Sequence, residues 1–108
     1  MNILPELIDE IRSLLVDEGD DEDHLFTDKA IVKIAREVDS INHALYILYT
    51  QKASKVLTEE GRIKAIKAGN AEVQKLSCIE MSKMFLEMAE HYKMLWVSEK
   101  ERVSQFIY

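Results

Sequence analysis

The chain of 108 residues contains few of the residues that break or cross-link a fold: one cysteine, one proline and three glycines. A single cysteine excludes an internal disulfide and is typical of a reducing compartment. Little proline and glycine, together with 47% hydrophobic residues, favours an ordered and mostly helical chain over a disordered one. The length is sufficient for one hydrophobic core and too short for two, so we expect a single domain.

Long hydrophobic runs and an excess of positive charge are also missing. The longest uninterrupted apolar run covers residues 44–49, whereas a membrane-spanning helix needs about 18–20 residues. We therefore expect no membrane partner. The formal net charge of −6 argues against a protein that wraps nucleic acid, because wrapping requires a basic surface. The negative net charge does not argue against a protein that lines a passage through which DNA slides.

The negative charge is concentrated in one short segment, residues 17–23. Without its carboxylates, the acidic and basic residues of the chain are equal in number. An EF-hand calcium loop needs glycine at its sixth position and glutamate at its twelfth, and no register of this segment supplies both. We therefore interpret the segment as a solvated anionic loop without a metal. Its carboxylates are Asp17, Glu18, Asp20, Asp21, Glu22 and Asp23.

Apolar spacing and capping residues predict four main helices. We expect them over about 5–16, 28–38, 41–57 and from 78 to about 97. Thr27 is a good N-cap for the second helix, and Asp39 or Ser40 for the third. Ser77 and Glu80 form the pattern of a capping box before the last helix. The third helix is apolar on all sides near its centre, so we place it in the middle of the fold.

Two alternatives remain open for residues 62–76. Gly69-Asn70 is a two-residue hairpin signal, whereas the surrounding alanines and lysines are good helix formers. With the hairpin preferred, the predicted fold is mainly α, a compact bundle of four main helices with a small β-hairpin before the last helix. Residues 1–97 would form this helical domain. Residues 98–108, charged at first and apolar at the end, would form a C-terminal tail or arm.

Residues that could build an active site are scattered. His24, His43 and His91 lie on separate predicted elements, and zinc sites usually show clustered ligands. Glu87-x-x-Glu90 puts two carboxylates on one helical face, as in all-α nucleotide pyrophosphohydrolases that bind magnesium. Those enzymes need a second acidic pair on a following helix, and none follows here. We therefore predict no enzyme, no cofactor and no metal site.

The order of elements and short motifs along the chain can be compared with that of known protein families. A short amphipathic helix and the acidic loop precede Leu25-Phe26-Thr27-Asp28, which opens a helix, and a central helix contains Ala44, Leu45 and Ala53. After a break at Gly61 come Lys67-Ala68-Gly69-Asn70-Ala71-Glu72-Val73, Leu76-Ser77 and a helix containing Met88-Ala89-Glu90-His91-Tyr92-Lys93. Over roughly residues 5–96, this order resembles the small head–tail connector (adaptor) proteins of long-tailed bacteriophages.

The resemblance implies a structural subunit of the phage neck. Such a subunit would form a ring, expected to be twelve-fold, beneath the portal protein, and would join head to tail while DNA passes as cargo. Its partners would be the portal and other neck or tail proteins. It would be assembled in the host cytoplasm and reside at the head–tail junction of the virion. The acidic loop could then face the DNA channel, where like charge keeps DNA from binding the wall.

Contact surfaces are the sites that this function requires. The candidate partner-binding residues are Trp96, Phe106, Ile107 and Tyr108. The apolar end of the tail is either an arm onto a neighbour or a segment folded back on its own core. Residues 52–75 carry a local excess of positive charge, which, with the acidic loop elsewhere, suits head-to-tail contacts between copies. The alternative function is a small acidic regulatory binding protein, a phage factor or antitoxin, that masks a host protein.

Overall fold

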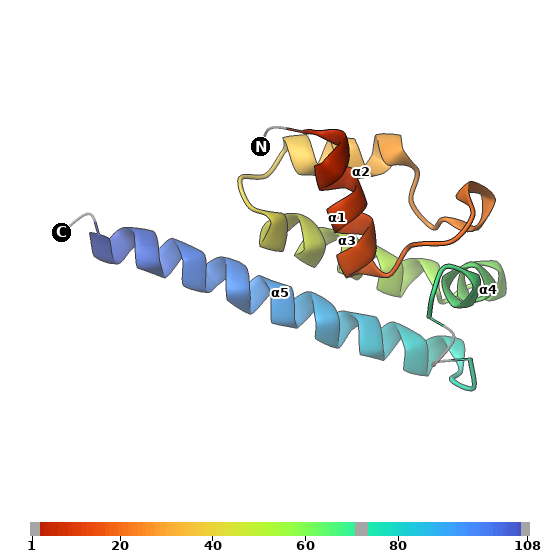
Figure 1. The fold of residues 1–108 in the computed structure, drawn as a ribbon. Helices are drawn as coiled ribbons and strands as arrows, with labels where there is room; N and C mark the ends of the chain where they lie inside the picture. Colours follow the sequence, from red (N-terminus) through yellow and green to blue (C-terminus); the bar gives the residue numbers. More distant parts are fainter. Residues whose placement is uncertain (1–2, 71–73, 107–108) are drawn as a thin grey trace.

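The computed structural model describes residues 3–70 and 74–106 and is mainly helical (Figure 1). Within these ranges there is no β-strand. The predicted mainly α fold class is therefore confirmed, and the described residues form five α-helices in place of the four predicted. The elements are α1 (Pro5–Leu15), a 3-10 turn η1 (Asp21–Asp23), α2 (Asp28–Arg36), α3 (Ile41–Lys55), α4 (Glu59–Lys67) and α5 (Cys78–Phe106).

Three helix starts follow from local capping, as the sequence predicts. The Thr27 hydroxyl accepts a hydrogen bond from the Ala30 amide at 3.1 Å. The Ser40 hydroxyl accepts one from the Asn42 amide at 3.1 Å. At α5, the Ser77 hydroxyl accepts from the Glu80 amide, and the Glu80 carboxylate accepts from the Ser77 amide, both at 3.2 Å. Each contact satisfies a backbone N–H that has no partner inside its helix.

Helix α3 lies at the centre of the fold, which confirms the prediction from its apolar surface. It contacts α1, α2 and α5. In Figure 1, α1 and α2 lie on one side of α3, and α5 runs along the other side. The buried core gathers around it and comprises Ile11, Leu15, Phe26, Ile31, Ala35, Leu45, Leu48, Tyr49, Ala53, Val56, Ala65, Met81, Phe85 and Ala89.

The predicted hairpin is wrong, because residues 59–67 form helix α4. Thr58 caps this helix by accepting a hydrogen bond from the Gly61 amide at 3.0 Å. Gly69, with a φ of +118°, follows the end of the helix, and the left-handed region is the usual conformation of a glycine there. The Asn70 side chain is buried and bonded to α4, where its amide donates to the Ala65 carbonyl at 2.8 Å. Residues 71–73 lie outside the described residues.

Helix α5 sets the long axis of the molecule. Its 29 residues correspond to about 44 Å, against about 22 Å for the 15 residues of α3. Its C-terminal end therefore extends beyond the other helices (Figure 1). The radius of gyration is 14.6 Å, against about 13 Å expected for a compact chain of this length. The helix predicted to end near residue 97 continues to Phe106, so residues 98–106 are part of α5.

Candidate functional site

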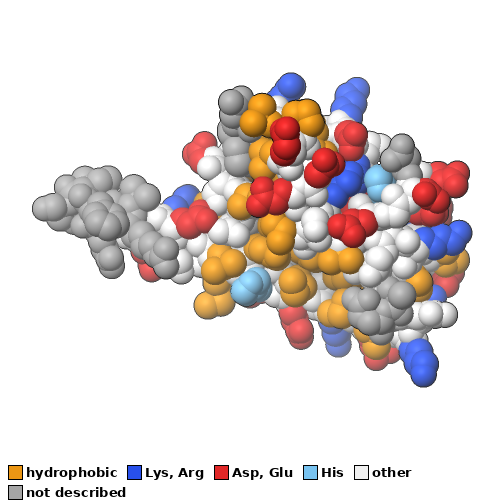
Figure 2. Space-filling model, viewed as in Figure 1, with side chains coloured by type: hydrophobic (Ala, Val, Ile, Leu, Met, Phe, Trp, Pro, Cys, Tyr) orange, Lys and Arg blue, Asp and Glu red, His pale blue; other side chains and the backbone are white. Residues whose placement is uncertain are grey.

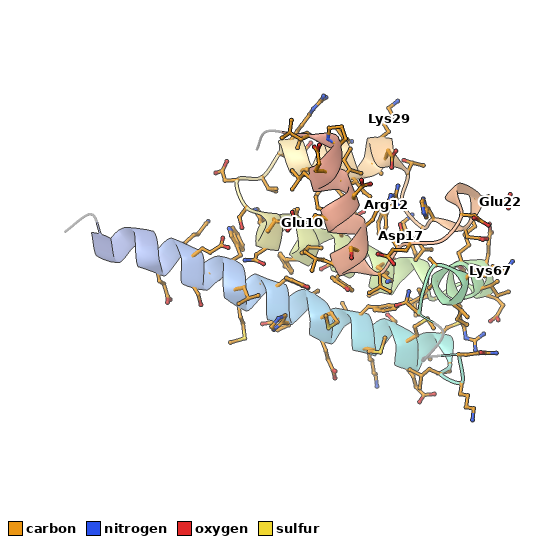
Figure 3. All side chains as sticks on the ribbon, in the orientation of Figure 1. Glu10, Arg12, Asp17, Glu22, Lys29 and Lys67 are labelled. Carbon is orange, nitrogen blue, oxygen red and sulfur yellow. The ribbon has the colours of Figure 1, made fainter. Side chains whose placement is uncertain are left out.

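The acidic run 17–23 has a buried first member. Asp17 has no exposed surface, and its Oδ2 lies 3.0 Å from Nη1 of Arg12. Its Oδ1 and Oδ2 accept hydrogen bonds from the amides of Leu25 and Phe26 at 2.8 and 3.1 Å. Figure 3 shows Arg12 and Asp17 close together beside α1. Asp17 is therefore part of the interior and contributes nothing to an anionic surface, contrary to its interpretation as a solvated residue.

The guanidinium of Arg12 joins three segments of the chain. Besides Asp17, its Nη2 donates to the Phe26 carbonyl at 2.9 Å and to the Asp28 carboxylate at 2.6 Å. These bonds connect α1, the start of α2 and the loop between them. A buried charge is stable only when it is paired and hydrogen-bonded, and both conditions are met here. The role of this cluster is to position the acidic loop.

Helix α4 holds the same loop from the other side. The Glu18 amide donates to the Ala68 carbonyl at 2.9 Å. Gly19 has a φ of +93°, and a Cβ there would lie 3.1 Å from the Lys67 carbonyl. Figure 3 shows Glu22 and Lys67 at the same end of the molecule. The predicted separation of the acidic loop from the basic segment is therefore wrong, because η1 and α4 are in contact.

Lys52 counts toward the basic segment in the sequence but is completely buried in the structure. Its Nζ donates to the carbonyls of Leu15 and Val16 at 2.6 and 3.3 Å and lies 4.3 Å from the centre of the Phe85 ring. Cations are favourable at the C-terminus of a helix because the last carbonyls there lack partners. Lys52 therefore fixes the end of α1 and leaves the exposed charge of residues 52–75 smaller than the sequence indicates.

One candidate binding site is a cavity of about 560 Å³ where the α2–α3 turn meets α5. Trp96 stacks on His43 with ring centres 3.8 Å apart and an interplanar angle of 11°. Nζ of Lys100 lies 4.2 Å from the centre of the Trp96 ring. We call this site the Trp96 cavity. Its lining consists of Glu37, Val38, Asp39, Ser40, His43, Trp96, Glu99 and Lys100.

Glu99 ties this part of α5 to the start of α3. Its carboxylate accepts a hydrogen bond from the Ser40 hydroxyl at 2.6 Å and another from the Asn42 side-chain amide. Carboxylates outnumber cationic side chains in the lining of the Trp96 cavity. Aromatic walls and carboxylates are the features that hold a partner side chain.

The predicted partner-binding residues have different positions in the structure. Trp96 is half-buried in the wall of the cavity, and Phe106 is the last residue of α5. Ile107 and Tyr108 lie outside the described residues. The tail up to Phe106 is helical and does not fold back on the core (Figure 1). Beyond Glu99, which bonds to Ser40 and Asn42, the last residues of α5 continue away from the body (Figure 1).

Groups with acid–base chemistry do not converge in the described part of the chain. Residues 3–70 and 74–106 contain no group of three or more His, Cys, Asp or Glu that could hold a metal ion. Glu87 and Glu90 are exposed on α5. Burial raises the pKa of Tyr49 and, to a smaller extent, the neighbouring Tyr92 does so too. The Tyr49 hydroxyl donates to the Leu14 carbonyl at 2.6 Å, so it acts as a neutral structural donor at physiological pH.

Comparisons with known proteins do not identify a family for this chain. No family model, no curated protein and no solved structure matches this chain. None of the helices in the described residues combines the length and the apolar character that crossing a membrane requires.

Proposed function

We propose that this chain is a structural subunit of a phage neck, forming a ring beneath the portal that joins head to tail. The observation that carries the proposal is the position of the C-terminal half of α5, which extends beyond the body with the Trp96 cavity at its base (Figure 1). Met94, Leu95 and Val97 are 64, 40 and 40% exposed there. A projecting helix with apolar side chains gains stability when another chain covers it.

The order of elements supports the assignment to this class of protein. The short amphipathic helix, the acidic loop, the Thr27-capped helix and the Ser77-capped helix resemble the small head–tail connectors in that order. In the proposed ring, the projecting end of α5 would bind the portal or a neighbouring subunit. Glu18, Asp20 and Glu22 are exposed at the end of the molecule that holds α4. Those carboxylates would face the DNA channel.

Co-expression with the portal protein encoded in the same genome tests the proposal. We expect the chain to co-purify with the portal and to give rings in electron micrographs. Deletion of residues 104–108 and Trp96→Ala should both reduce co-purification while the circular dichroism of the isolated chain stays helical. Leu57→Ala, at an exposed position near α4, is the matched control and should bind like the wild type. A Trp96→Ala protein that assembles at the wild-type level would refute the assigned contact.

The exposed carboxylates near α4 also favour a second candidate, a small acidic regulatory protein that masks a host protein. Glu18, Asp20 and Glu22 are exposed and accessible to a basic partner, and Figure 3 shows Glu22 at the end of the molecule that holds α4. Neutralising all three, as Glu18→Gln, Asp20→Asn and Glu22→Gln, separates the two functions. The change should abolish masking of a host protein but leave portal binding in place.

A further inference from the structure

Helix α5 presents a face that no part of the described chain covers. The core-facing side carries Met81, Phe85 and Ala89, all buried. On the opposite side, Ile79, Leu86, Met94 and Val97 are 64, 48, 64 and 40% exposed. Hydrophobic side chains appear in broken patches from α1 down to α5 in the view of Figure 2. We define the outer face of α5 by Ile79, Lys83, Leu86, Glu90, Lys93, Met94, Val97 and Glu101, which helical spacing places together.

The outer face places two charged side chains between two apolar ones along α5. From Leu86 onward it reads Leu86, Glu90, Lys93 and Val97, with spacings of four, three and four residues. These spacings are those of the seam of a coiled coil. The two central positions have opposite charge, and the two outer positions are apolar. The midpoint of the four lies between residues 91 and 92.

A second helix of the same sequence complements this order when it runs in the opposite direction. Rotation about a two-fold axis through the midpoint brings Leu86 opposite Val97 of the second copy and Glu90 opposite Lys93 of the second copy. Because a two-fold contact repeats every pairing, two ion pairs lie between two apolar layers. The four layers span about 16 Å of helix. Glu90 and Lys93 are both exposed, and Nζ of Lys93 lies 5.8 Å from the Tyr46 ring, at the edge of the outer face.

The surface of α5 has a hollow that this arrangement would fill. The hollow measures about 280 Å³ and includes Val97, the residue that faces Leu86 of the second copy. The exposed Leu86 side chain is an apolar group of suitable size for it. The residues that line the hollow are Glu90, Lys93, Met94, Val97, Ser98 and Glu101.

We propose that two copies of this chain associate through the outer faces of their α5 helices in antiparallel orientation. Charge selects this arrangement among the alternatives. A parallel pair would put Glu90 against Glu90 and Lys93 against Lys93, and an antiparallel pair centred on residue 90 would again oppose two glutamates. Like charges in direct contact across an interface are unfavourable, whereas the proposed register has only opposite charges at its centre. The contact closes with two copies, and it covers Met94 and Val97, two of the side chains that the proposed ring contact would also cover.

Charge reversal at the two central positions tests the register. Sedimentation equilibrium of the full chain, from micromolar to millimolar concentration at low salt, should show a monomer–dimer equilibrium. Glu90→Lys and Lys93→Glu should each weaken dimerisation by at least about tenfold, because each variant opposes two like-charge pairs in its own dimer. An equimolar mixture of the two variants should associate again, since every central pair in the mixed dimer has opposite charge. The double variant should dimerise like the wild type.

The mixed dimer distinguishes the contact from effects within one helix. Each single variant also changes the Glu90–Lys93 pair within its own helix. Mixing the two proteins cannot restore that pair, so renewed association would come from the contact between copies. Circular dichroism should give the same helix content for all variants. Glu10→Lys and Lys29→Glu, at exposed positions on α1 and α2, are the charge-matched controls and should dimerise normally. A wild type that is monomeric at every concentration, or a mixture that associates no more than its components, would overturn the proposal.

Discussion

At the scale of the residue, charged side chains divide into those that build the interior and those that cover the surface. Asp17 and Glu22 stand in the same acidic run, yet one is buried against Arg12 and the other is exposed. The positions of Arg12 and Lys52 in the sequence indicated that these two charged side chains face the interior. Arg12 falls on the apolar stripe of α1, four residues after Ile8, and Lys52 lies four residues after the buried Leu48 of α3. Charge type alone therefore did not identify the residues that hold the acidic loop.

Replacement of Asp17 by alanine should destabilise the protein strongly. The change leaves the Arg12 guanidinium buried without its inner partner, and it removes the acceptor of two backbone amides. Breaking a buried ion pair costs about 3–5 kcal/mol. Glu22→Ala, in the same run but exposed, should change the free energy of unfolding by less than about 0.5 kcal/mol. Urea unfolding measures both, and equal losses would contradict the burial of Asp17.

Tyr49 should make the protein less stable at alkaline pH. Burial raises the pKa of Tyr49 above the ordinary tyrosine value of about 10, so above about pH 10 the hydroxyl ionises in the unfolded chain but resists ionisation in the folded one. Its contribution to stability is therefore complete below about pH 10 and is lost as the pH rises further.

Tyr49→Phe provides the measurement for this effect. It should cost about 1 kcal/mol at neutral pH, because the hydrogen bond to the Leu14 carbonyl is lost. Between about pH 9 and about pH 11, the variant should lose less free energy of unfolding than the wild type. Urea titrations at the two pH values give the comparison. Parallel losses in the two proteins would show that Tyr49 carries no alkaline dependence.

At the scale of the element, helix starts could be predicted and the region of α4 could not. Thr27, Ser40 and Ser77 bond to amides within three residues, so the sequence contains the whole interaction. The Gly69-Asn70 pair also suggested a local structure, a hairpin turn. In the folded chain, however, the Asn70 side chain bonds to the carbonyls of Val16 and Ala65. A contact 54 residues away in the chain decided the conformation of this segment.

Gly61→Ala tests how tightly the start of α4 is packed. Alanine in a helix is usually more stable than glycine by about 1 kcal/mol. Here a Cβ would lie 2.0 Å from the Lys55 carbonyl oxygen, so the backbone must move and the sign of the effect reverses. We expect a lower thermal midpoint for Gly61→Ala in differential scanning calorimetry. Glu60→Ala, at the exposed neighbouring position, should leave the midpoint nearly unchanged, and a stabilising Gly61→Ala would contradict the contact.

At the scale of the whole molecule, the fold is a small body with one long helix extending from it. The body surrounds α3, and α5 extends the long axis to 50 Å, against 28 and 18 Å in the other directions (Figure 1). Both proposals use this shape. The end of α5 and the Trp96 cavity would serve the neck assembly, and the outer face of α5 would serve a two-fold contact.

Hydrogen exchange should divide α5 into two parts. Amides of residues 81–92 lie where α5 packs against α3 and should be protected for long times, because their exchange requires opening of the core. Amides of residues 102–106 lie beyond the Glu99 contact with α3 and should exchange at least about a hundredfold faster in the isolated chain. Mass spectrometry of peptides from the two parts measures the difference. Equal protection of all amides along α5 in dilute solution would contradict this prediction, because it would mean that the C-terminal end of the helix is covered.

The sequence by itself determined the helical class, the starts of α2, α3 and α5, and the central place of α3. These features depend on hydrophobic spacing and on contacts between residues a few positions apart. The tertiary structure alone decided that Asp17 and Lys52 are buried, that the acidic loop lies against α4, and that residues 59–67 are helical. Their energies depend on carbonyls and carboxylates that approach from distant parts of the chain, and no local pattern specifies which of those groups will meet.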